Sequence, residues 1–246
     1  MTIDLGGTAA DAWALWRRDR IVLLPLAGLF LFVPTLALLL LVTPLTVPAD
    51  TVIRPGTAET AAFLAQYRAW IGANAGYFIT VSIVSAYGAL AIFAFYFDRT
   101  ADTLRDALIG ALALLPRYLL AGIIGTVLTM VGFALFFLPG IYLAGRLLLL
   151  GPVLVAEAPL SAIDSLVRSF GITRRHGWIL AGVMVIAFVA DVVLPAPFQN
   201  LDATLRGLRA ANPVVIVVVD AMAAAIATAV ALGLLLFKVA LYRRLA

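Results

Sequence analysis

Six apolar segments, each long enough or nearly long enough to cross a bilayer, constrain this chain more than any other feature. A spanning helix needs about 20 apolar residues to cross roughly 30 Å of hydrocarbon. The chain is 64% hydrophobic and only 12% charged, whereas an average soluble domain is about 25% charged. The sequence therefore predicts an all-α integral membrane protein with one polytopic domain over residues 1–246, and it excludes a water-soluble enzyme. The segments are Ile21–Leu45, Tyr77–Phe97, Tyr118–Phe137, Ile141–Ala156, Trp178–Pro197 and Val214–Leu236.

The junction between the third and fourth segments predicts a tight turn. Leu138, Pro139 and Gly140 form a turn signal between two apolar runs. One uninterrupted helix from Tyr118 to Ala156 would be far longer than the hydrocarbon core is thick. We therefore expect these two segments to form a hairpin that turns at Pro139 and Gly140.

The basic residues predict the orientation of the chain. Lys and Arg concentrate in the cytoplasmic loops of membrane proteins. If both termini are cytoplasmic, twelve of the seventeen Lys and Arg residues lie on the inner side, four lie on the outer side, and Arg146 lies inside a span. We therefore expect both termini in the cytoplasm, and we attribute the basic composition to the membrane surface rather than to a nucleic-acid partner.

An amphipathic segment precedes each odd-numbered apolar segment. These segments are Thr8–Arg18, Thr100–Leu115 and Ser161–Thr173, and basic residues end or follow each of them. Their apolar residues recur at helical spacing, which predicts three helices lying at the cytoplasmic membrane interface. The expected fold is therefore six transmembrane helices arranged as three hairpins, each preceded by an interfacial amphipathic helix. Whether this is a true structural repeat stays open, because any six-helix protein with basic inner loops would show the same alternation of segments.

Two outer loops also show helical patterns. In the long loop after the first segment, Pro48–Gly56 has the composition of a turn, whereas Ala58–Ile71 lacks Pro and Gly and has apolar residues at helical spacing. We expect a short helix on the outer surface over Ala58–Ile71. The Gln199–Asn212 loop is expected to hold another short helical turn.

Three charged residues fall inside the apolar segments: Arg146, Asp191 and Asp220. A charge at the centre of a span costs roughly 2.5–3.5 kcal/mol on insertion scales, which makes such residues candidates for function. Counted from the expected outer ends of their spans, all three lie about 7–11 Å below the outer boundary, so we expect Arg146 to bridge to Asp191, to Asp220 or to both. Two interpretations stay open, namely an ion pair that only joins helices and a polar pocket that binds a headgroup or an ion.

Glu157 ends the fourth segment on the expected cytoplasmic side, next to the helix that carries Arg168. A Glu–Arg pair here would fasten that helix to the bundle, and a solvated carboxylate at the boundary is the alternative. An exposed pair of this kind contributes only about 0–1 kcal/mol. We therefore treat Glu157 as a structural candidate rather than a catalytic one.

The sequence lacks the residues for the common catalytic and metal chemistries. It has no cysteine and a single histidine, His176, which excludes thiolate chemistry and disfavours a histidine-based metal site. The P-loop, the HExxH zinc motif and the Gly-x-Ser-x-Gly elbow are absent. We therefore expect no enzyme activity, no metal and no cofactor.

The most distinctive stretch begins at Leu138-Pro-Gly-Ile-Tyr-Leu-Ala-Gly-Arg146, passes through Glu157, and continues with Ser165-Leu-Val-Arg-Ser-Phe170 and Thr173-Arg-Arg-His-Gly-Trp178. This pattern of about 40 residues resembles the YciC-like bacterial inner-membrane proteins, and it is similar to the membrane domain attached to some glycerophosphodiester phosphodiesterases. The resemblance implies a six-span protein of the bacterial inner membrane in the neighbourhood of lipid metabolism. Phosphodiesterase activity is not implied, because the chain lacks the soluble catalytic domain. The positions that carry the resemblance are structural candidates: Pro139, Gly140, Glu157, Arg168, Ser169 and Arg174, together with Arg146.

These observations favour a membrane protein that binds or transports a lipid or another amphiphile. Its candidate binding residues are Arg146, Asp191 and Asp220, in the outer half of the bundle. The alternative is a non-enzymatic scaffold or assembly factor for other membrane proteins, which the small-residue helix surfaces would suit. The expected partners are therefore membrane lipids and, under the alternative, other membrane proteins.

Overall fold

The computed structural model describes residues 3–45, 54, 56–98, 103–207 and 212–246. This part of the chain is 88% helix and contains no strand, so the prediction of an all-α fold is confirmed. The helices are α1 (Leu5–Ala27), η1 (Gly28–Phe32), α2 (Val33–Leu41), α3 (Ala58–Phe97), α4 (Leu104–Leu135), α5 (Phe137–Arg146), α6 (Leu150–Ala156), α7 (Ala162–Ile172), α8 (Gly177–Val193), α9 (Ala196–Gly207) and α10 (Pro213–Leu245).

Within the described residues, six helical runs are long and apolar enough to cross a membrane. Each predicted apolar segment falls largely within one of these runs, which is the pattern of a multi-pass membrane protein. Large apolar side chains stand exposed on them, among them Ile186 at 70% and Phe188 at 69% exposure. Such surfaces are costly in water and suit a lipid environment. The runs are Leu5–Leu41, Ala58–Phe97, Leu104–Leu135, Phe137–Ala156, Gly177–Gly207 and Pro213–Leu245.

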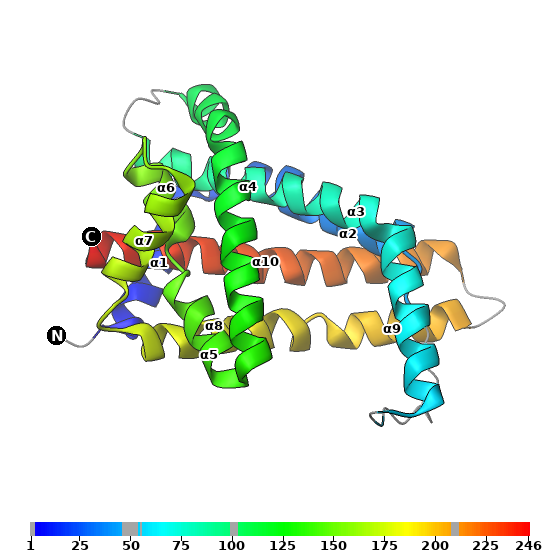
Figure 1. The fold of residues 1–246 in the computed structure, drawn as a ribbon. Helices are drawn as coiled ribbons and strands as arrows, with labels where there is room; N and C mark the ends of the chain where they lie inside the picture. Colours follow the sequence, from blue (N-terminus) through cyan, green and yellow to red (C-terminus); the bar gives the residue numbers. More distant parts are fainter. Residues whose placement is uncertain (1–2, 46–53, 55, 99–102, 208–211) are drawn as a thin grey trace.

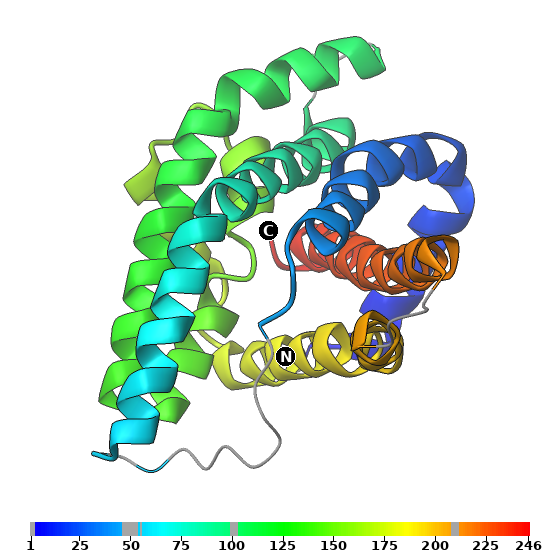
Figure 2. The same ribbon diagram turned by 90° about the vertical axis from the view of Figure 1, so that its right-hand side faces the viewer.

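The helices form a bundle with both termini at the same end (Figure 1). Most of the long helices run along the bundle, namely α2, the last part of α3, α8 with α9, and α10 (Figure 1). Helix α4 runs across the direction of α8 and α10 in both views (Figures 1 and 2). Arg244 near the end of α10 pairs with Asp11 of α1, with 2.6 Å between Nη2 and Oδ2. We call the end that holds the termini the termini end, and the opposite end the far end.

The core of the bundle is built from several helices. Among its largest fully buried side chains are Phe93 of α3, Leu23 of α1, Leu154 of α6 and Leu180 of α8. At Gly151 of α6 a Cβ atom would collide with the ring of Phe93. The glycine therefore allows α6 to approach α3 closely, as small residues do in membrane helix packing.

Several helices that we expected to be separate are continuous with the spans. The predicted interfacial helix Thr8–Arg18 is the first part of α1, most of Thr100–Leu115 is the first part of α4, and the predicted surface helix Ala58–Ile71 is the first part of α3. No strong helix breaker separates the first of these from its span, and Pro116 is accommodated within α4, as prolines are in membrane helices. The predicted turn over Pro48–Gly56 lies almost entirely outside the described residues.

The third interfacial segment does form a helix of its own. Helix α7 begins after Ser161, whose side chain accepts a hydrogen bond from the backbone N–H of Asp164, a standard N-terminal cap. The expected helical turn within Gln199–Asn212 is also present, but it is α9, which begins earlier, at Ala196, and follows α8 after a short turn.

The turn between the third and fourth spans lies earlier than predicted. Phe136 is extended, with φ −168° and ψ 154°, and α5 begins at Phe137. Pro139 and Gly140 therefore lie in the first turn of α5, where a proline lacks no hydrogen bond that the helix needs. A Cβ atom at Gly140 would collide with Phe133, so this glycine lets the two arms of the hairpin meet.

Candidate functional site

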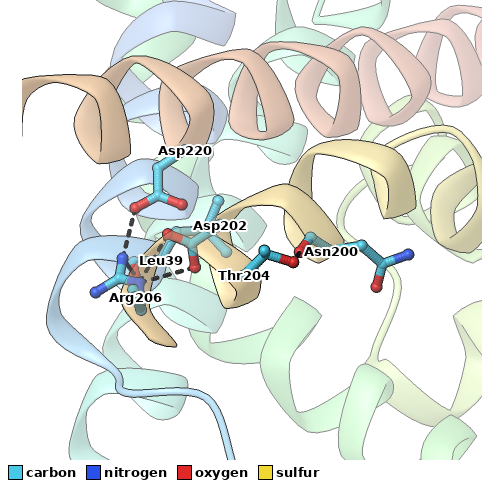
Figure 3. Close-up of polar contacts among 6 residues, drawn as sticks. All are labelled: Leu39, Asn200, Asp202, Thr204, Arg206 and Asp220. Carbon is cyan, nitrogen blue, oxygen red and sulfur yellow. Dashed lines mark hydrogen bonds and ion pairs between the residues drawn. The ribbon is translucent and has the colours of Figure 1, made fainter. Parts of the chain in front are cut away.

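Two arginine-centred clusters stand out, one at each end of the bundle. The first, which we call the far-end triad, consists of Asp202, Arg206 and Asp220 (Figure 3). Arg206 Nε lies 2.7 Å from Asp202 Oδ1, one turn away on α9, and Nη2 lies 2.7 Å from Asp220 Oδ2 on α10. Nη2 also donates to the carbonyl oxygen of Leu39 in α2, at 3.3 Å. One guanidinium thus joins three helices.

The two carboxylates of the far-end triad are buried and share one guanidinium. The side chains of Asp202 and Asp220 are 7% and 3% exposed, and that of Arg206 is 28% exposed. Hydrogen bonds between a guanidinium and carboxylates are short and strong, and removing one partner of a buried pair leaves an uncompensated charge. Because both carboxylates already engage Arg206, this arginine is not available to an anionic ligand.

The second cluster, which we call the Arg146 centre, consists of Arg146, Tyr142, Phe170 and Thr173. Arg146 ends α5, and its Nε donates to Thr173 Oγ1 at 2.9 Å and its Nη1 to Tyr142 Oη at 2.7 Å. Nη2 donates to the carbonyl oxygen of Phe170. The guanidinium carbon also lies over two rings, 5.5 Å from the centroid of Tyr142 and 5.0 Å from that of Phe170.

Small residues let the elements of the Arg146 centre approach each other. A Cβ atom at Gly177, the first residue of α8, would lie 2.5 Å from Cε2 of the Tyr142 ring and 2.9 Å from Arg146 Cδ. A Cβ atom at Gly145 would collide with the backbone of Ala181 in α8. The buried Ser169 donates to the carbonyl oxygen of Arg146 at 2.9 Å. The resulting junction holds α5, α7 and α8 together.

The charge of the Arg146 centre is not balanced within the described residues. No acidic side chain there forms an ion pair with Arg146, whose partners are two hydroxyls, one carbonyl and two ring faces. Arg174 and Arg175 follow directly and are exposed. Positive charge therefore accumulates at this junction.

The expected bridge from Arg146 to Asp191 or Asp220 is wrong. Arg146 lies beside Gly177, at the start of α8, whereas Asp191 lies fourteen residues further along the helix, which is about 21 Å. Asp191 is exposed, and Asp220 belongs to the far-end triad. The depth estimate failed because it assumed that each span runs straight across the bilayer, whereas α4, which forms one arm of the α4–α5 hairpin, runs across the bundle (Figure 1).

Of the two alternatives for Glu157, an ion pair and a solvated carboxylate, the structure has the ion pair. Arg168 Nε lies 2.8 Å from Glu157 Oε2, and Tyr242 Oη donates to Glu157 Oε1 at 3.0 Å. The hydrogen bond to Glu157 raises the pKa of the Arg168 guanidinium. Glu157, at the end of α6, thus joins Arg168 of α7 and Tyr242 of α10 at the termini end.

Asp202, Arg206 and Thr173 were not among the residues singled out in the sequence. Asp202 and Arg206 have the i,i+4 spacing of a helical ion pair, and this spacing, in a segment expected to hold a helical turn, is a signal that could have identified them. Thr173 offered no comparable signal, because a single hydroxyl is a common feature of any helix end. Its role depends on the contact between α5 and α7.

Comparisons with family models, with curated proteins and with solved structures found no match for this chain.

Proposed function

We propose that this protein binds a lipid or another amphiphile with an anionic headgroup, and that the Arg146 centre holds the headgroup. The observation that carries the proposal is the half-buried guanidinium of Arg146, which has only neutral partners in the described structure. The proposal is one of binding and includes no catalytic step. It places the ligand at the termini end rather than in the outer half of the bundle.

The chemistry of Arg146 suits a phosphate group. A guanidinium has five N–H donors in a planar fork and binds phosphate through two of them at once. Three of the donors of Arg146 make hydrogen bonds within the described structure. The aromatic faces of Tyr142 and Phe170 hold the guanidinium plane in place, so the remaining donors are positioned in advance.

The surroundings of the Arg146 centre suit the headgroup region of a membrane. Trp178 is 64% exposed beside Tyr142, and tryptophan favours membrane interfaces. On α7, Ile163 and Val167 are exposed on one edge, which fits a helix lying at the interface. Basic residues near a membrane surface attract anionic lipids by about 1 kcal/mol each.

We also propose the orientation and the arrangement of the spans. The excess of Lys and Arg at the termini end favours a cytoplasmic location for both termini in a bacterial inner membrane. Consecutive spans contact each other as α2 with α3, α4 with α5, and α9 with α10, which supports three hairpins. Figure 2 shows the first part of α1 crossing the termini end, which supports an interfacial role for that segment.

The resemblance to the YciC-like proteins is part of this proposal. Two pairs of the residues that carry it are in contact, because Ser169 donates to the carbonyl oxygen of Arg146 and Glu157 pairs with Arg168. These contacts give part of the sequence pattern a physical reason.

The proposal is tested by mass spectrometry of the lipids that co-purify with the protein in a mild detergent. We would compare the wild type, Arg146→Gln shown to be folded by thermal unfolding, and Arg68→Gln as a control at an exposed arginine of α3. We expect one anionic lipid class to be enriched in the wild type and the control and depleted in Arg146→Gln. The same lipids in all three proteins would contradict the proposal.

A second candidate function is a scaffold for other membrane proteins, and the α4–α5 hairpin favours it. At its tip, Phe136 and Phe137 are 70% and 68% exposed, and an apolar surface of this kind suits a protein contact inside the membrane. A photo-crosslinker at Phe136 would capture one defined membrane protein if this function is correct. Capture of lipid alone, as at the exposed control position Ile186, would exclude it.

A further inference from the structure

An apolar groove of about 420 Å³ lies between α1 and α10, away from both arginine clusters. Its volume is within the range of small-molecule sites, about 300–1,000 Å³. Trp13 and Trp16 line it from α1, and Leu232, Gly233 and Phe237 line it from α10. Its lining is thus apolar, with two tryptophans on one wall.

Two exposed arginines continue the tryptophan-bearing stripe of α1. Counted from Trp13, the residues Trp16, Arg17 and Arg20 lie three, four and seven positions further along α1, which places all four on one side of the helix. Arg17 and Arg20 are exposed, and neither forms an ion pair within the described residues. Arg18, in contrast, is paired with Asp19 at 2.9 Å. Unpaired positive charge therefore lies directly next to the apolar groove.

We propose that this groove holds one acyl chain of a phospholipid whose anionic headgroup is bound by Arg17 and Arg20. The apolar lining matches the chain, and the two arginines match the negative charge of the headgroup. Tryptophan favours the level between hydrocarbon and headgroups, which fits the two tryptophans on the wall of the groove. This site is separate from the Arg146 centre, because it is built from α1 and α10 alone.

Gly233 is a position at which a larger side chain can fill the groove. A Cβ atom built there meets nothing within 4 Å, so Gly233→Leu places its added side chain in the open space of the groove. Replacing glycine within a helix also favours the helix. Gly182 on α8 has the same open surroundings, so Gly182→Leu is a matched control.

The test measures binding of phosphatidylglycerol to the full chain in detergent by native mass spectrometry. We expect Gly233→Leu to weaken one binding event about tenfold or more, because burying even two methylene groups is worth that much. Arg17→Gln/Arg20→Gln should weaken the same event about tenfold at low ionic strength and less in high salt. Gly182→Leu should bind as the wild type does.

Three results would overturn the proposal. The first is unchanged binding of phosphatidylglycerol by Gly233→Leu. The second is equal binding of phosphatidylcholine or of glycerol phosphate, which would remove the requirement for the charge or for the chain. The third is a change from dimer to monomer in Gly233→Leu with lipid binding intact, which would assign the groove to a second copy of the chain. If the proposed function of the Arg146 centre is wrong, lipid binding will be unchanged in Arg146→Gln, and the effect of Gly233→Leu will not be altered.

Discussion

The far-end triad and the Arg146 centre both place one arginine where three helical elements meet, yet their electrostatics are opposite. Arg206 is held by two buried carboxylates, whereas Arg146 is held by hydroxyls, a carbonyl and aromatic faces. In the first cluster the protein supplies all the counter-charge. In the second cluster it supplies none within the described residues, so an anionic ligand can supply it. This difference separates a structural arginine from a binding arginine.

The largest expected effect is on stability at the far end. Arg206→Leu leaves Asp202 and Asp220 buried without their cation, so it should lower the free energy of unfolding by about 3 kcal/mol or more. Thermal unfolding in detergent measures this. Adding Asp202→Asn and Asp220→Asn to Arg206→Leu should recover part of the loss. A loss below about 1 kcal/mol for Arg206→Leu would show that the triad is not the closed unit described here.

A smaller effect on stability is expected at the Arg146 centre. Arg146→Gln removes hydrogen bonds to Thr173, Tyr142 and the Phe170 carbonyl, so it should cost about 1–3 kcal/mol. Unlike Arg206→Leu, it should also reduce the binding of anionic lipid. The comparison fails if Arg146→Gln destabilises the protein as strongly as Arg206→Leu while lipid binding is unaffected.

The Glu157–Arg168 pair should contribute less to stability than either arginine cluster. Arg168 is 50% exposed in this pair, and exposed pairs measure about 0.2–1 kcal/mol in double-mutant cycles. A cycle of Glu157→Gln and Arg168→Gln should therefore give a coupling energy in that range, decreasing as salt is added. A coupling energy above about 2 kcal/mol would show that this pair stabilises the protein as a buried pair does, like the far-end triad.

The smallest effect is expected at Asp191. This carboxylate is exposed and has no hydrogen-bonded or ionic partner among the described residues. Asp191→Asn should therefore change the free energy of unfolding by less than about 0.5 kcal/mol and leave lipid binding unchanged. Loss of lipid binding in this variant would restore the expectation that Asp191 belongs to the site.

Hydropathy was sufficient to locate the six apolar spans, because the length and composition of a span are local properties. It could not show where a helix stops. Pro116 and Gly76 both lie inside long helices, although each is a breaker in water-soluble proteins. Inside a membrane the backbone has few alternatives to the helix, so such residues are weaker boundaries there.

The candidate site was less predictable than the fold. Arg146 was identified because a charge in an apolar segment is conspicuous, but its partners were not, because they depend on how α5 meets α7 and α8. Residue counting gave a common depth to Arg146, Asp191 and Asp220, and the crosswise α4 invalidates that count (Figure 1). Asp202 and Arg206 were missed because they lie outside the predicted spans, whereas the candidate charges were sought inside them.

The most direct test of the account is the affinity of the Arg146 centre for phosphatidylglycerol relative to phosphatidylcholine. Titrations of the wild type, Arg146→Lys and Arg146→Gln, each shown to be folded by thermal unfolding, would measure it. We predict that the wild type prefers phosphatidylglycerol, that Arg146→Lys retains part of this preference, and that Arg146→Gln loses about tenfold or more in affinity at one site. A folded Arg146→Gln that binds phosphatidylglycerol as the wild type does would contradict the account.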